Sequence, residues 1–68
     1  MPDIEQVIKA AESLEVEVRA LVDIARLVRA SKVREVILSA AQRTSLRAEA
    51  LAHLTDAEGL LATIRQVL

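Results

Sequence analysis

His53 heads the short list of residues in this chain that could do chemistry. Glu49 lies four residues before it, so a helix would place the carboxylate beside the imidazole, as in a general-base dyad. Such a dyad needs a nucleophile, and nothing in the sequence positions the hydroxyl of Ser45 for that role. We therefore interpret Glu49 and His53 as an exposed pair on a helix surface, and we predict a protein that is not an enzyme.

Other kinds of functional site have little support in the residues. The chain has no cysteine and a single histidine, which leaves too few ligands for a zinc site of the usual type. It contains no Gly-rich phosphate loop, no His-Glu-x-x-His and no Gly-x-Ser-x-Gly sequence. We expect no cofactor, no metal and no small-molecule substrate.

A pattern typical of nucleic-acid binding lies at 37–54, which reads ILSAAQRTSLRAEALAHL. Ala41 is followed four places later by Ser45 at a turn, and apolar residues come after it at Leu46, Leu51 and Leu54. This spacing resembles the DNA-binding helix-turn-helix family, with Ser45 where the turn glycine is usual. The resemblance implies a recognition helix over 46–54. It also implies nucleic-acid contacts from five residues: Lys32, Arg43, Thr44, Arg47 and His53.

The composition of that recognition helix argues against this role. Its groove-facing residues would include Glu49 and Ala50 beside a single arginine, Arg47, which is a poor set for reading bases. The formal charge of the chain is −1, and only its middle third, 31–53, is mildly basic. Site-specific binding commonly uses about six to ten phosphate contacts. A small dimeric helix-turn-helix protein therefore stays the alternative, behind a structural role.

The longest periodic stretch of the sequence, 3–29, contains no Gly and no Pro. Apolar residues recur in it at alternating spacings of three and four: Ile4, Val7, Ala11, Leu14, Val18, Leu21, Ala25 and Val28. This spacing predicts one helix of roughly 40 Å whose apolar stripe forms a coiled-coil or bundle seam.

The rest of the chain predicts two or three further helices. Ser31 has the character of an N-cap, which predicts a helix over 32–43, and QRTS predicts a turn at 42–45. A stripe of apolar residues then predicts a helix over 46–68: Ala50, Leu54, Ala57, Leu61, Ile64 and Leu68. Thr55 to Glu58 has the form of a capping box and Gly59 disfavours a helix interior. This stretch is therefore either one helix or two, 46–54 and 55–68.

The hydrophobic residues are abundant but small. They make up 53% of the chain and include no Phe, Trp or Tyr, so a core made of them buries little area per residue. A chain of 68 residues is also near the lower size limit for an unassisted core. We therefore expect the chain to gain buried area by pairing with copies of itself, most simply as a dimer.

These observations predict a single all-α domain over 1–68, a three- or four-helix bundle built on the long N-terminal helix, in a homo-oligomer. We expect its core and interface to contain twelve residues: Ile4, Val7, Ala11, Leu14, Val18, Leu21, Ala25, Val28, Leu54, Leu61, Ile64 and Leu68. The agreement of caps, helix-dipole charges and heptads resembles designed or engineered (de novo) helical bundles. That resemblance implies a style of fold and no activity.

The sequence gives no reason to place the protein at a membrane. No apolar run approaches the ~18–20 residues of a membrane span. The first residues, MPDIEQ, lack the basic and apolar regions of a secretory signal. We expect a cytoplasmic protein that acts through protein–protein interaction, as a self-associating scaffold or adaptor.

Overall fold

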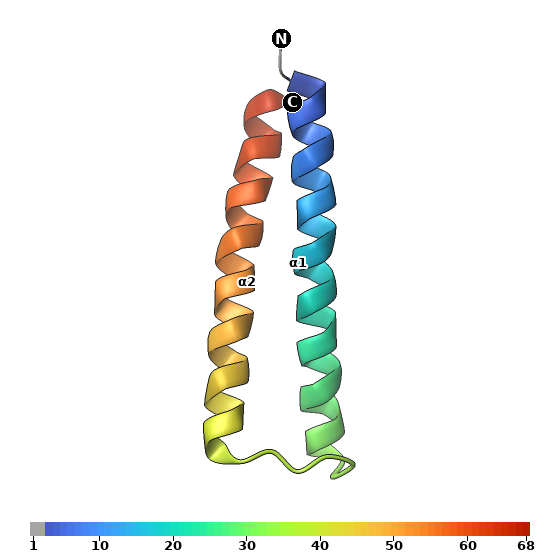
Figure 1. Cartoon of the computed structure of the whole chain (residues 1–68), viewed down its shortest axis with the longest axis vertical. Helices are drawn as coiled ribbons and strands as arrows, with labels where there is room; N and C mark the ends of the chain where they lie inside the picture. The colour runs from blue at the N-terminus through green and yellow to red at the C-terminus, as the bar shows by residue number, and fades with distance from the viewer. Residues whose placement is uncertain (1–2) are drawn as a thin grey trace.

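Two antiparallel helices form the structure (Figure 1). A computed structural model describes residues 3–68, with α1 at Asp3–Lys32, α2 at Ala40–Val67 and a loop at 33–39 between them. The helices lie side by side in a rod with extents of 51 × 17 × 12 Å. The all-α prediction is confirmed, but the described part of the chain has two helices where three or four were predicted.

The first helix follows its sequence pattern. α1 runs for 30 residues without Gly or Pro, with Asp3 and Glu5 in its first turn and Arg29 and Lys32 in its last. Acidic groups at the N-terminus and basic groups at the C-terminus both interact favourably with the helix dipole. The helix predicted over 3–29 is therefore confirmed, and it continues three residues further.

The end of α1 is a Schellman motif centred on Arg34, whose φ is 63°. The Arg34 N–H donates to the Ser31 carbonyl at 3.2 Å, and the Glu35 N–H donates to the Ala30 carbonyl at 2.9 Å. Ser31 thus lies inside α1. The helix predicted over 32–43, with Ser31 as its N-cap, is wrong because the chain leaves α1 through this motif.

The N-cap of the second helix is Ser39. The Gln42 N–H donates to Ser39 Oγ at 3.1 Å, and the Ser39 N–H donates to Gln42 Oε1 at 2.8 Å. These two bonds form a capping box, which satisfies two backbone donors at the start of α2. The Ser-x-x-Gln signal is present in the sequence at 39–42, eight residues after the cap that was predicted.

The second helix is continuous through both places where the sequence suggested an interruption. The hydroxyls of Thr44 and Thr55 donate at 3.0 Å to the carbonyls four residues earlier, so both threonines are satisfied inside the helix. Gly59 is helical as well. The turn predicted at 42–45 is therefore wrong, and of the two alternatives for 46–68 the structure has the single continuous helix. Packing along α1 outweighs these weak local preferences.

The two helices touch through narrow inner faces that follow a 4-3 spacing. On α1 the inner face contains Val7, Ala10, Leu14, Glu17, Leu21 and Ile24. On α2 it contains Leu46, Ala50, His53, Ala57, Leu60, Ile64 and Val67. Only Ala10 and Ala57 are buried within residues 3–68, at 6% and 8% exposure. Two helices cover each other on one side only, so the larger inner side chains stay half-exposed.

The inner faces differ from the predicted seam. Of the twelve predicted core and interface residues, Val7, Leu14, Leu21 and Ile64 lie on them. Seven of the predicted residues are exposed in the hairpin: Ile4, Val18, Ala25, Val28, Leu54, Leu61 and Leu68. α1 carries two adjacent apolar stripes, and the spacing alone does not decide which of them meets the neighbouring helix.

We predict that Arg34→Gly stabilises the hairpin by about 1 kcal/mol, because glycine adopts a positive φ without the steric cost that a side chain brings. Arg34→Ala is the matched control, since it removes the same charge but keeps a Cβ, and it should leave stability nearly unchanged. Thermal unfolding at one protein concentration measures both. Equal stability of the two variants would contradict the assignment of Arg34 to the left-handed position.

We predict that Gly59→Ala stabilises α2 by about 1 kcal/mol, since alanine has the higher helix propensity. A Cβ at Gly59 meets no atom within 4 Å, so the gain is not offset by a clash. The exposed Ala62, one turn later, supplies the reverse control: Ala62→Gly should destabilise the helix by a similar amount. Urea unfolding compares the two. A destabilised Gly59→Ala protein would show that this surface is covered.

Candidate functional site

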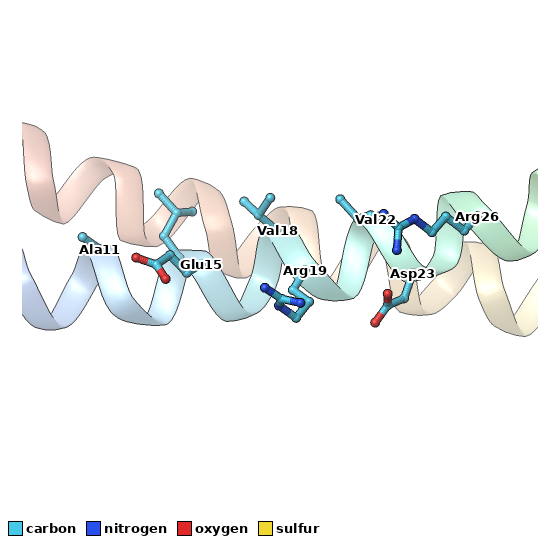
Figure 2. A pocket seen from close by; sticks show the side chains of 8 residues that line it. Ala11, Glu15, Val18, Arg19, Val22, Asp23 and Arg26 are labelled. Carbon is cyan, nitrogen blue, oxygen red and sulfur yellow. The ribbon is translucent and has the colours of Figure 1, made fainter.

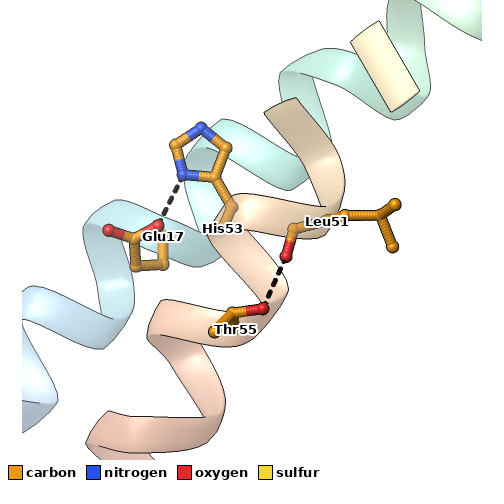
Figure 3. A network of polar contacts seen from close by, with 4 residues as sticks. All are labelled: Glu17, Leu51, His53 and Thr55. Atoms are coloured by element: carbon orange, nitrogen blue, oxygen red, sulfur yellow. Dashed lines mark hydrogen bonds and ion pairs between the residues drawn. The ribbon is translucent and has the colours of Figure 1, made fainter. Parts of the chain in front are cut away.

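Glu17 and His53 meet between the helices at their mid-length (Figure 3). The imidazole Nδ1 lies 2.5 Å from Glu17 Oε2, so Nδ1–H donates to the carboxylate. The side chains are 18% exposed for Glu17 and 33% for His53. Within residues 3–68 this is the one contact between a carboxylate and a basic or imidazole side chain closer than 4.0 Å. The predicted exposed pair of Glu49 and His53 is wrong, because His53 bonds to Glu17, while Glu49 itself is exposed.

This pair links the two helices at one register. The nearby Thr55 hydroxyl donates to the Leu51 carbonyl and is already engaged (Figure 3). Among residues 3–68, no three His, Cys, Asp or Glu side chains are grouped so that they could hold a metal ion. What the pair does provide is a defined register, because sliding one helix past the other would leave Glu17 facing apolar side chains.

Shallow grooves lie on both sides of the helix contact. Their lining residues show which side of α1 lies next to which side of α2. One groove of about 350 Å³ is lined by Ile24 and Val28 of α1 and by Arg47 and Ala50 of α2, among others. The groove on the other side is lined by Leu27 of α1 and by Gln42 and Ser45 of α2, among others. The side of α1 that carries Val28 therefore adjoins the side of α2 that carries Arg47.

Helical spacing extends the first of these sides along the rod as a mainly apolar surface, which we call the apolar flank. It contains Ile4, Ile8, Ala11, Val18, Val22, Ala25 and Val28 of α1 and Leu51, Leu54, Leu61 and Leu68 of α2. Its nine large aliphatic side chains are between 37% and 82% exposed. All seven of the exposed seam residues noted above lie on it.

The opposite side of the hairpin, the polar flank, has a different composition. Its residues include Gln6, Lys9, Ser13, Val16, Asp23, Gln42, Ser45, Glu49, Asp56 and Gln66. Among the described helical residues, Val16 is its one large exposed aliphatic, at 67% exposure. The hairpin is thus two-sided. A contiguous apolar surface of this kind marks an interaction site more often than scattered exposed aliphatics do.

A groove of about 560 Å³ runs along α1, from the apolar flank across the outer surface of the helix to Asp23 on the polar flank. Its lining includes Ala11, Leu14, Val18 and Val22 beside the charged residues Glu15, Arg19, Asp23 and Arg26. Figure 2 shows Val18 and Val22 along one edge and Arg19 and Asp23 along the other. An apolar strip with a charged rim is the surface that another amphipathic helix can cover.

The predicted nucleic-acid residues do not form one surface. Lys32, Arg43 and Arg47 lie at the loop end of the hairpin, in the last turn of α1 and the first turns of α2. The Thr44 hydroxyl is bonded to the Ala40 carbonyl, and His53 is engaged with Glu17 at mid-length. The helix is also continuous at Ser45, where the helix-turn-helix pattern requires a turn.

Nine inner-face residues were absent from the predicted set: Ala10, Glu17, Ile24, Leu46, Ala50, His53, Ala57, Leu60 and Val67. For α2 the sequence does contain a signal for the inner face, because Leu46, His53, Leu60 and Val67 recur every seven residues. Glu17 had none, since a glutamate on a helix is ordinarily solvated.

Comparisons with family models, with curated proteins and with solved structures give no match for this chain. Neither helix of the described chain is long and apolar enough to cross a membrane. The candidate site therefore depends on the geometry alone: the central Glu17–His53 pair and the apolar flank.

We predict that His53→Leu alone lowers stability by roughly 1 kcal/mol, because it leaves the half-buried Glu17 without a partner. The double variant Glu17→Leu with His53→Leu should be at least as stable as the unchanged chain, since a well-packed apolar pair replaces a half-buried polar pair at no loss. Chemical unfolding at a fixed protein concentration tests both. A double variant as weak as the single one would show that the pair itself stabilises the fold.

Proposed function

We propose that this chain is a non-enzymatic structural module, a helical hairpin that associates with a copy of itself through the apolar flank and acts as a scaffold or adaptor. The observation that carries the proposal is the apolar flank itself, where nine large aliphatic side chains on two helices are exposed along one side. Residues 3–68 contain no second layer that covers them. An identical hairpin offers a surface of the same length and chemistry.

The exposed area supports this proposal. A folded monomer of 7.4 kDa exposes about 4,200 Å² by the usual scaling with mass. This chain exposes 5471 Å². The excess of about 1,300 Å² is comparable to the roughly 800 Å² that each partner buries in a standard interface. The radius of gyration is 15.4 Å, against about 11 Å for a compact chain of 68 residues. A second rod packed alongside would bring both the exposed area and the radius of gyration closer to the values of a compact protein.

The small core supports it as well. Only two alanines are buried in the described hairpin, and alanine contributes little hydrophobic free energy. Covering a large aliphatic side chain contributes about 1.5–3 kcal/mol when burial is complete. Burial of the exposed leucines and valines of the apolar flank would therefore contribute most of the additional hydrophobic free energy, and association would bury them.

Nucleic-acid binding is the second candidate. It draws support from the basic residues near the loop, where Lys32, Arg43 and Arg47 lie at one end of the rod. Binding to mixed-sequence duplex that weakens steeply with salt would favour it, because phosphate neutralisation releases counterions. Absence of binding at low salt excludes it. The apolar flank has no part in such a role, so self-association explains more of the exposed surface.

We predict that the chain sediments as a dimer at tens of micromolar and that Val18→Asp, on the apolar flank, converts it to a monomer. Val16→Asp is the matched control: it places the same substitution two residues away in the same helix, on the polar flank, and should leave the dimer intact. Analytical ultracentrifugation gives the masses, and circular dichroism confirms helicity. A strictly monomeric unchanged chain up to millimolar concentration would refute the proposal.

A further inference from the structure

The charges of the hairpin divide sharply at its mid-length. The terminal half, 3–17 with 54–68, carries seven acids and two bases, a net charge of −5. The loop half, 18–53, carries seven bases and three acids, a net charge of +4. Because α1 and α2 are antiparallel, each of these halves is one physical end of the rod (Figure 1). The chain as a whole is nearly neutral, but the two ends of the rod therefore carry opposite net charges.

Two symmetric arrangements would bring one apolar flank against another. In the matched arrangement the loop ends lie together, and α1 faces α2 of the other copy. In the inverted arrangement each loop end lies on the other copy's terminal end, with α1 against α1 and α2 against α2. Both arrangements are closed two-fold dimers in which neighbouring helices are antiparallel, so the apolar surface and the helix dipoles favour neither.

The charges do discriminate between them. The matched arrangement sets two ends of −5 beside each other and two ends of +4 beside each other, whereas the inverted one sets −5 against +4 twice. Like charges placed together across an interface are disfavoured, and opposite charges fix the orientation and accelerate encounter. We infer that the occupant of the apolar flank is a second copy of this chain in the inverted arrangement, an inference that rests on the proposed self-association.

The inverted arrangement pairs particular residues. Val18 and Leu54 lie nearest the mid-length of α1 and α2, so each meets its own counterpart at the two-fold axis. Glu58 lies about four residues from the middle of α2 and Arg47 about six, on opposite sides of it. Inversion therefore brings Glu58 to within about 3 Å, along the axis, of the height of Arg47 of the partner subunit. Matching would instead place Glu58 among the acids of the other copy's α1.

A distance measurement between spin labels tests the orientation. The chain has no cysteine, so Gln6→Cys on the exposed polar flank gives one neutral attachment site per chain. Gln6 lies some eleven residues from the middle of α1, so inversion separates the two labels by about 35 Å or more along the axis. Matching leaves them separated only by the width of the bundle, roughly 20–25 Å.

The result separates failure of this inference from failure of the proposed function. A main distance near 35 Å or beyond, lost on dilution with unlabelled chain, supports inversion. A main distance of roughly 20–25 Å overturns inversion but leaves self-association standing. No distance between chains, together with a monomer in ultracentrifugation, overturns both. Unlabelled Gln6→Cys under reducing conditions should keep the mass of the unchanged chain, as the labelling control.

Charge reversal supplies a second readout. At low salt, Arg47→Glu and Glu58→Arg should each weaken the dimer about tenfold, because each sets like charges together twice per dimer. The combined variant should return to within about threefold of the unchanged chain. Both positions are exposed and helical, so circular dichroism should show an unaffected fold. Tighter association of Glu58→Arg alone would overturn inversion, since only the matched arrangement surrounds this residue with acids.

Discussion

The structure depends on a narrow contact between the inner faces of α1 and α2. A pair of helices can cover each other along one strip only. The most buried residues of this strip are alanines, and it contains one polar pair and no aromatic ring. Counting outward from Glu17 and His53 places Ala10 at the height of Leu60, so a small side chain faces a large one. The helices can then approach closely, but little area is buried, and the remaining aliphatics stay exposed on the flank.

The polar pair gives this strip a defined register. An apolar strip made of alanines, leucines and valines packs nearly as well after a shift of one helical turn, because its side chains are alike. Glu17 and His53 meet at a single register and would be left unpaired at others. A polar contact inside an apolar interface commonly costs some stability and contributes specificity, and that trade-off fits a fold with so few distinctive side chains.

Two asymmetries of the hairpin determine different aspects of the proposed association. The difference between the apolar and polar flanks selects the side on which another helix can pack. The difference in charge between the terminal and loop halves selects the direction in which it packs. Neither asymmetry is visible in the overall composition, where a formal charge of −1 suggests an electrically featureless chain. The charge asymmetry arises because the loop at 33–39 folds the acidic N-terminal residues back beside the C-terminal ones.

The sequence alone determined the helical class, the extent of α1 and the excess of apolar surface, because each depends on residue type and local spacing. Its local signals misplaced other features. Ser31 and Ser39 are both plausible N-caps, and only the Schellman motif at Arg34 decides between them. Thr55 and Gly59 suggested a break worth about 1 kcal/mol, which packing along α1 overrides. The choice between the two stripes of α1 was decided by tertiary structure, because it depends on Glu17 meeting a histidine 36 residues away.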